Sequence, residues 1–286
     1  MFVVILLGLF PFILGGILGY LLAKKGINAH NALANHQKLV YIILGVSVSV
    51  VMAVIILSKL KLATLLPAII ILIVGEFFSK FVLILGCFGL GLLIFIELKS
   101  WRNWQRLREM IVATTIMSLC LGGLGYCLIP VTPILGKSKI VNGIVIQTTA
   151  YTCVPSSIAT LGRWIGKYPN LSERDAVKLT HTNRFGTSHL AEIWALEKLK
   201  LDPEYQRDLT IDDLIKMNKY AILHVNEPVG FAGATMGHAI ALLDINIKKK
   251  YLVVGNPAYG RQVKPFNQMD SNYWIGEAVF INHNLK

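Results

Sequence analysis

The sequence predicts two domains of different kinds, an all-α membrane-spanning region over residues 1–135 and an α+β domain over residues 136–286. Hydrophobic residues make up 54% of the 286-residue chain, and its mean hydropathy of +0.58 is too high for an ordinary soluble protein. Charge divides the chain at the same point. The first 135 residues carry 10 Lys and Arg against 3 acidic residues, whereas the remainder carries 18 against 13. At the same point, long apolar runs are replaced by short runs in which apolar and polar residues alternate.

The net charge of +12 is shared between the loops that flank apolar segments and a mildly basic second domain. We read it as membrane topology and surface contact, because no RNA- or DNA-binding motif accompanies it. No nucleic-acid partner is therefore expected. No His, Cys or Asp cluster has the spacing of metal ligands, and neither a metal nor a cofactor is expected.

The membrane region is predicted to contain about five spans, with four as the alternative. A bilayer core of roughly 30 Å is crossed by about 20 helical residues. The apolar run 62–98 is too long for one such helix, and the polar pair Ser79-Lys80 is expected to split it into two short helices; a re-entrant or interfacial hairpin stays open. The other expected spans are Phe2–Ala23, Leu39–Leu57 and Ile111–Leu135.

An integral membrane protein is thus expected, with the lipid bilayer as one partner. Glu76 and Glu97 are interpreted as interfacial anchors near the ends of spans. The basic loop 99–109, which contains two Trp, is typical of a cytoplasmic interface and would place the second domain outside the cytoplasm. The loop with Lys24, Lys25 and Lys38 is also basic, and five spans put the two loops on opposite faces. The balance of charge leans only slightly to the extracytoplasmic side.

The second domain is predicted to place its helices before an antiparallel set of strands. Residues 140–147 read as a strand or a pair of short strands, and the helix Cys153–Ile165 follows. Ser172 is expected to cap the next helix, with Asp175 three residues on. Further helices are expected from Thr187 or Ser188 and over 210–218. The expected strands cover 220–226, 238–246, 249–257 and 277–283.

Cys153 is the only cysteine of the polar domain, so this domain can hold no internal disulfide and cysteine usage does not fix the redox compartment. The other three, Cys87, Cys120 and Cys127, lie in apolar runs and are read as packing residues. A cysteine nucleophile needs its thiolate form, which a helix N-terminus and a neighbouring imidazolium both favour. Cys153 lies at the first turn of its helix, and this position makes it a candidate nucleophile.

Three further residues complete a candidate catalytic site. His238 follows Gly237 at the start of a predicted strand and could act as the base. Asn256, at the end of the next strand, would lie beside it in a hairpin and hold one tautomer of its imidazole. Gln147 could donate a hydrogen bond to an oxyanion beside the backbone N–H of Cys153. Other histidines receive structural interpretations: His181 and His189 could line a cleft but are read as surface loop residues, and His224 is read as a strand residue.

The order Gln, Cys, His, Asn resembles that of papain-like peptidases. Within them, Gln147-x5-Cys153, Gly237-His238 and Asn256-Pro257-Ala258-x-Gly260 resemble the double-glycine leader peptidases over about residues 140–284. The segment FGTSHLAEIWALEKLKL, residues 185–201, is similar to that family's Gly-Thr-Ser segment. The resemblance implies a papain-like fold with Cys153 as nucleophile, His238 as base, Asn256 as orienting residue and Gln147 as oxyanion donor.

This family is often fused to bacteriocin-exporting ABC transporters, so the resemblance also implies a peptide substrate, a bacterial plasma membrane and a separate ABC exporter as partner. The sequence departs from the family's pattern. Thr152 and Val154 flank Cys153 where the family has Asp-Cys-Gly, and Asn256 replaces the family's Asp. No nucleotide-binding GxxxxGK[ST] motif is present, and the spans come before the peptidase domain.

Three functions follow from these patterns. The first is a membrane-anchored cysteine endopeptidase that acts through an acyl-enzyme. The second is a catalytically silent peptidase-like domain that binds peptide cargo for a transporter. The third, transport by the spans themselves, is disfavoured because they contain few charged residues.

Overall fold

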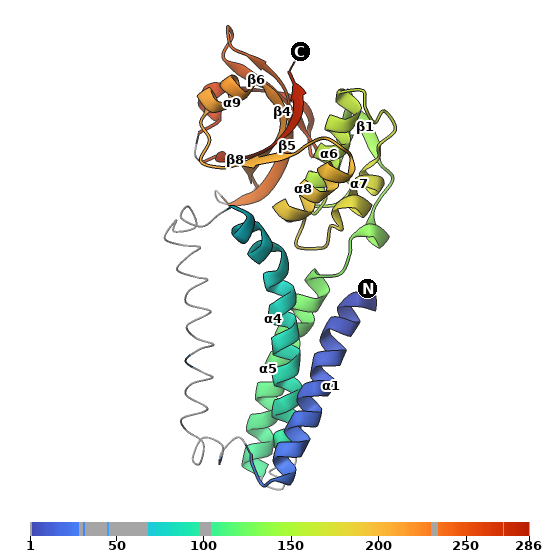
Figure 1. The fold of residues 1–286 in the computed structure, drawn as a ribbon, viewed down its shortest axis with the longest axis vertical. Helices are drawn as coiled ribbons and strands as arrows, with labels where there is room; N and C mark the ends of the chain where they lie inside the picture. Colours follow the sequence, from blue (N-terminus) through green and yellow to red (C-terminus); the bar gives the residue numbers. More distant parts are fainter. Residues whose placement is uncertain are drawn as a thin grey trace. The chain divides into compact units, whose positions relative to one another are not determined.

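The computed structural model describes residues 2–28, 68–97, 104–229, 234–270 and 272–285, together with residues 31 and 45. The chain forms two compact units, Met1–Ile129 and Pro130–Lys286. The division falls a few residues before the boundary predicted from the sequence. The elements of each unit are labelled in Figure 1.

The described residues of the first unit lie mainly in helices. Among the described residues, three helices are long and apolar enough to cross a membrane. They are α1 (Phe2–Lys24), α4 (Ala68–Ile96) and α5 (Trp104–Cys127). The predicted span Leu39–Leu57 lies outside the described residues, so the predicted number of spans stays a prediction.

The predicted break at Ser79-Lys80 is wrong, because α4 runs through it as one continuous helix. Lys80 forms an ion pair with Glu76, one turn earlier on the same helix. The i, i+4 spacing lets the two charges neutralise each other without any change in the backbone. The last span also differs from its prediction, since α5 begins at Trp104 and takes in residues assigned to the preceding loop.

Glycines allow α1 and α4 to pack backbone against backbone. A Cβ atom added at Gly15 would lie 2.0 Å from the carbonyl oxygen of Phe88. In the opposite direction, a Cβ atom at Gly91 would lie 2.1 Å from the carbonyl oxygen of Phe12. Small residues permit such close approach where no hydrophobic effect drives helices together, as in a membrane.

The second unit is α+β, with helices mostly before strands as the sequence predicts. Its helices are η3 (Thr132–Ile134), α6 (Cys153–Trp164), α7 (Glu173–Thr180), α8 (His189–Lys198), α9 (Ile211–Met217) and η4 (Phe266–Gln268). Its strands are β1 (Lys139–Val141), β2 (Ile144–Ile146), β3 (Glu204–Gln206), β4 (Lys219–Pro228), β5 (Thr235–Asn246), β6 (Tyr251–Asn256), β7 (Gly260–Pro265) and β8 (Trp274–Asn284).

Local signals in the sequence explain where several of these elements begin. Strands β1 and β2 form a hairpin joined by a two-residue turn. Asn142 and Gly143 in this turn both have positive φ angles, which an Asn-Gly turn prefers. Ser172 caps α7 through its side chain, as predicted, and Ser188, one of the two residues at which a helix was expected to start, caps α8 in the same way. Thr210 and Asp213 form a complete capping box at the start of α9.

Six strands form one antiparallel sheet in the order β3-β8-β4-β5-β6-β7. Four of them match predicted strands, whereas β3 and β7 were not predicted. Apolar side chains pack on both faces of the sheet. One core joins Ile158 and Leu161 of α6 to Ile222, and the other joins Leu214 of α9 to Leu223. In Figure 1, α6 and α8 accordingly lie on one side of the strands and α9 on the other.

Candidate functional site

Cys153 is the first residue of α6, and its side chain is half-buried. The helix forms because its apolar residues recur at helical spacing and cover the sheet, with Ile158 and Leu161 fully buried. The residue before Cys153, Thr152, occupies the N-cap position but makes no capping hydrogen bond with its side chain. Thr152 is itself fully buried, so its hydroxyl group must find another partner.

That partner is Glu173, a buried carboxylate at the start of α7. Its Oε1 accepts a hydrogen bond from the Thr152 hydroxyl at 2.6 Å and another from the backbone N–H of Thr148 at 2.8 Å. Both donors belong to the segment between Gln147 and Cys153. Glu173 therefore fixes the approach of the chain to Cys153. No local signal in the sequence indicates this role, because the contacts join residues 21 and 25 positions apart.

His238 and Asn256 lie side by side on the neighbouring strands β5 and β6. The imidazole Nε2 of His238 is 2.9 Å from Asn256 Oδ1, and both side chains are buried. The hairpin predicted between these strands is present. His238 lies inside β5, three residues after the strand begins at Thr235, instead of opening it.

The surroundings of Asn256 identify which ring nitrogen of His238 carries the proton. The backbone N–H of Ala258 donates to Asn256 Oδ1 at 2.9 Å, so this atom is the carbonyl oxygen of the amide and can only accept. The Asn256 amide group in turn donates to Gln262 Oε1 at 3.3 Å. Neutral His238 must then donate through Nε2–H, which leaves Nδ1 as its basic nitrogen.

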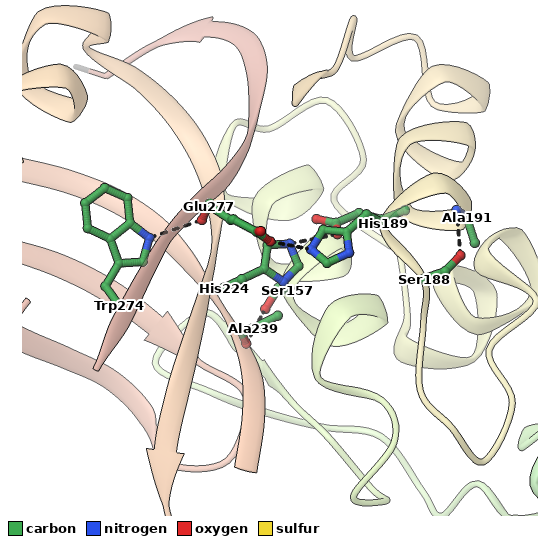
Figure 2. A network of polar contacts seen from close by, with 9 residues as sticks. Ser157, Ser188, His189, Ala191, His224, Ala239, Trp274 and Glu277 are labelled. Carbon is green, nitrogen blue, oxygen red and sulfur yellow. Dashed lines mark hydrogen bonds and ion pairs between the residues drawn. The ribbon is translucent and has the colours of Figure 1, made fainter. Parts of the chain in front are cut away.

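Helix α6 is tied directly to the strand that carries His238. Ser157, one turn beyond Cys153, donates its hydroxyl hydrogen to the carbonyl oxygen of Ala239 at 3.1 Å, as Figure 2 shows. Cys153 and His238 both line a cavity of about 400 Å³. Other described residues in its wall include Tyr151, Arg184, His189 and His224.

Gln147 does not line this cavity, but it lies next to the turn at Asn256 and Pro257 that follows β6. Its backbone N–H donates to the carbonyl oxygen of Pro257, the residue after Asn256, at 3.0 Å. Its side-chain Oε1 is buried and has no hydrogen-bond partner among the described residues. The structure thus brings Gln147 beside the Asn256 turn, while its role as oxyanion donor stays a prediction.

The ionisation of Cys153 differs from what the helix N-terminus predicts. Burial raises the pKa of the Cys153 thiol, outweighing hydrogen bonds from the backbone N–H groups of Ala239 and Val154, and the charge of Glu192 raises it further. Burial also lowers the pKa of His238, against the opposing effects of Asn256 and Glu227. The free site therefore favours a neutral thiol and a neutral imidazole over a preformed ion pair.

Two more histidines at the cavity wall each lie against a carboxylate. His189 Nε2 lies 3.1 Å from Glu277 Oε2, and His224 Nε2 lies 3.0 Å from Glu192 Oε2. The two imidazole rings are stacked at a tilt, with centroids 4.2 Å apart, and Figure 2 shows them between α8 and the strands. The interpretation of His189 as a surface loop residue is wrong, because it begins α8 and lines the cavity beside Glu277, with its side chain 34% exposed.

Each carboxylate changes the acid–base behaviour of its neighbours. Burial lowers the pKa of His189, but the contact with Glu277 and the charge of Glu192 outweigh burial and raise it overall. Burial raises the pKa of Glu277, but His189, together with smaller effects of His224 and Tyr205, outweighs burial and the net shift is downward. In the described part of the chain, no group of three or more His, Cys, Asp or Glu side chains is placed to hold a metal ion.

No protein-family model matches the sequence, and the curated proteins contain no significant match. The solved structures that match include peptidase domains of ABC transporters. One is a double glycine motif protease from an AMS/PCAT transporter in complex with the leader peptide, 19% identical, with a TM-score of 0.41 over 52% of this chain and 94% of that one.

Two further matches are peptidase domains of ComA. That of Streptococcus ComA, a bi-functional ABC transporter involved in a quorum-sensing pathway, is 21% identical, with a TM-score of 0.41 over 50% of this chain and 98% of that one. That of Streptococcus mutans ComA is 20% identical, with a TM-score of 0.37 over 49% of this chain and 98% of that one.

Proposed function

We propose that the protein is a membrane-anchored cysteine endopeptidase with a papain-like catalytic domain. Cys153 is the nucleophile, His238 the general base and Asn256 the residue that orients His238. The observation that carries the proposal is the hydrogen bond from His238 Nε2 to Asn256 Oδ1 at 2.9 Å. It directs Nδ1, the basic nitrogen, away from Asn256 in a buried site whose cavity also contains Cys153.

The proposed reaction begins when His238 Nδ1 removes the proton of the Cys153 thiol as sulfur attacks the scissile carbonyl carbon. The negative charge that develops on the carbonyl oxygen is stabilised by the backbone N–H of Cys153 and the side-chain amide of Gln147. The imidazolium then gives its proton to the leaving amine as the C–N bond breaks. Water, deprotonated by His238, hydrolyses the resulting thioester and releases Cys153 as a thiol.

Double-glycine leader peptides are the first substrate class to test, because the sequence motifs around Cys153, His238 and Asn256 resemble the peptidases of that class. In this proposal the helices of the first unit anchor the domain at a bacterial plasma membrane. A separate ABC exporter would then receive the cleaved product. Labelling of Cys153 and of a Lys286→Cys variant from each side of sealed vesicles would identify the side that holds the domain.

The decisive experiment compares the purified full chain with its Cys153→Ala variant. Peptides that contain a Gly-Gly leader site are incubated with each protein, and products are identified by mass spectrometry. Cleavage by the wild type alone supports the proposal, whereas equal cleavage by both proteins refutes it. Iodoacetamide labelling is read by peptide mapping, because Cys87, Cys120 and Cys127 can also react.

A catalytically silent domain that binds peptide cargo is the second candidate, favoured by the raised pKa of the Cys153 thiol. A protonated thiol reacts slowly with carbonyl groups unless a base is in place. The two functions separate in one assay. Peptide binding without any covalent adduct at Cys153 from an electrophilic peptide probe would support the silent domain.

A further inference from the structure

Helix α6 carries two consecutive serines, Ser156 and Ser157, and both are fully buried. Buried hydroxyl groups normally have hydrogen-bond partners. Ser157 has one, since its Oγ donates to the carbonyl oxygen of Ala239 at 3.1 Å (Figure 2). Ser156 Oγ has none among the described residues. The two hydroxyl groups therefore differ in their contacts, although they belong to neighbouring residues of one helix.

Ala239, the acceptor of this bond, directly follows His238 on β5. Strand β4 pairs with both residues, but the ladder between β5 and β6 begins only at Ala241. Backbone groups of residues 238–240 that face the β6 side therefore need partners other than a strand. Ser157 of α6 is such a partner for Ala239, a residue that is 1% exposed and so has little access to water.

The N–H group of Ala239 is directed at Cys153. Burial raises the pKa of the Cys153 thiol, and the hydrogen bond from the N–H of Ala239 is the largest effect in the opposite direction. In an antiparallel strand, the N–H and C=O groups of one residue lie on the same side. Cys153 and Ser157 are four residues apart and share one face of α6. This face of the helix therefore holds both backbone groups of Ala239.

We propose that Ser157 is a positioning residue for the nucleophile. By holding the carbonyl group of Ala239, it fixes α6 on β5, keeps the N–H of Ala239 directed at the sulfur of Cys153, and sets Cys153 relative to His238. Ser157 does not line the cavity, so a substrate bound there does not touch it. The inference rests on the proposed function for its catalytic meaning, whereas its effect on the reactivity of Cys153 is independent of peptide cleavage.

Other charged and titratable groups surround Cys153, and the test leaves all of them in place. Those that line the cavity with it are Arg184, His189, His224 and His238. The charge of Glu192 also acts on the thiol. Because none of these residues is substituted, a difference between the variants reports the hydroxyl group at position 157.

The test is the rate of alkylation of Cys153 by iodoacetamide in the full chain, measured by peptide mapping from pH 6 to pH 10. Ser157→Ala removes the hydroxyl group and frees the backbone of Ala239 to move away from the sulfur. The thiolate then loses a donor, so we expect alkylation at pH 7 to slow about fivefold and the pH profile to move upward. Loosened packing alone would instead expose the thiol and speed its alkylation.

Two further variants separate the hydrogen bond from packing. Ser156→Ala is the matched control, because it removes a buried hydroxyl group from the adjacent residue without loss of a described hydrogen bond. We expect it to leave the alkylation rate of Cys153 unchanged. Ser157→Thr keeps a hydroxyl group at the same position and is expected to recover most of the wild-type rate. All rates are compared at a temperature at which thermal unfolding shows the variants to be folded.

For a peptide that the wild type cleaves, the same variants are compared by steady-state kinetics. Ser157→Ala is expected to lower kcat about tenfold and to leave KM unchanged, because the substrate does not touch Ser157. Ser156→Ala is expected to change neither constant. A rise in KM with unchanged kcat in Ser157→Ala would overturn the proposal, since it would mean that Ser157 acts on substrate binding.

Slower alkylation in Ser157→Ala, with recovery in Ser157→Thr and no change in Ser156→Ala, supports the proposal. Unchanged or faster alkylation in Ser157→Ala would overturn it. Equal slowing in either of the other variants, or a Ser157→Ala protein that folds at no temperature, would also overturn it. The alkylation assay needs no substrate. A wild-type protein that cleaves no peptide but shows the expected alkylation pattern would refute the proposed function and retain the effect of Ser157 on Cys153.

Discussion

The imidazole of His238 and the amide of Asn256 lie in hydrogen-bond contact across the strands β5 and β6, with Nε2 2.9 Å from Oδ1. Removing the amide in Asn256→Ala frees the imidazole to adopt either tautomer. We expect kcat/KM for peptide cleavage to fall about 100-fold. Asn256→Asp retains an acceptor at the same place and should preserve most of the activity. Loss of activity in both variants to the same extent would contradict an orienting role.

The pH dependence of cleavage follows from the environment of His238. The pKa of His238 is lowered from its ordinary value of 6.5, mainly by burial. Because only the neutral imidazole can act as a base, kcat/KM should hold constant as pH falls to 6.5 and decline below it. In Asn256→Asp, the added negative charge stabilises the imidazolium, so the decline should begin at higher pH. If the decline of kcat/KM at low pH did not shift in this variant, His238 would not be the base that Asn256 orients.

Glu173 should contribute strongly to the stability of the second unit. Glu173→Ala removes the charged acceptor of the part-buried Thr148 N–H and of the buried Thr152 hydroxyl, which keeps the carbonyl oxygen of Thr149 at 3.1 Å as an acceptor. Hydrogen bonds to a charged group contribute about 1.5–3 kcal/mol each, so we expect a loss of about 3 kcal/mol in the free energy of unfolding. The exposed Glu197 provides the control, and Glu197→Ala should change stability by less than about 0.5 kcal/mol. Denaturant titration measures both.

The His189–Glu277 pair should stabilise the fold in a defined pH window. The pKa of His189 is raised above 6.5, so its contribution is complete below pH 6.5 and is lost as pH rises through the folded-state pKa. The pKa of Glu277 is lowered below 4.5, so its contribution is lost only as pH falls below that value. His189→Gln should therefore lower Tm more at pH 5.5 than at pH 8.5. An equal decrease in Tm at both pH values would contradict a stabilising charge interaction between His189 and Glu277.

Close packing of α1 against α4 can be tested with two leucine substitutions. Gly15→Leu places a side chain where the carbonyl of Phe88 already lies, so the helices must separate. A Cβ atom at Gly122 of α5 meets no described atom within 4 Å, and Gly122→Leu serves as the control. We expect lower thermal stability in detergent for Gly15→Leu alone. Comparable losses in both variants would show that the contact is unimportant.

Local signals in the sequence were sufficient for much of the second unit. The cap Ser172 located α7, the segments from Thr187 or Ser188 and over 210–218 located α8 and α9, and alternating apolar runs located β4, β5, β6 and β8. The pairing of His238 with Asn256 could be predicted because a short basic turn joins the two apolar runs that contain them. The strands β3 and β7 were missed, because one is three residues long and the other alternates polar residues at the edge of the sheet.

Contacts between distant segments account for what the sequence did not predict. Glu173 looks like an ordinary acidic residue in the first turn of a helix, and only the fold brings it to Thr152. The two His–Glu pairs join α8 to strands that follow much later in the chain. The raised pKa of Cys153 has the same origin, because burial depends on the whole domain and outweighs the local effect of the helix N-terminus.

The unbroken course of α4 limits how it can lie in a bilayer. At 1.5 Å per residue, its 29 residues extend about 43 Å, against a hydrocarbon core of roughly 30 Å. Even a tilt of about 40°, near the upper limit for such helices, leaves a vertical extent of about 33 Å. A crossing by α4 therefore requires that one end reach the headgroups or that the bilayer thicken around it. Its length makes the protein sensitive to membrane thickness, and thus to lipid composition.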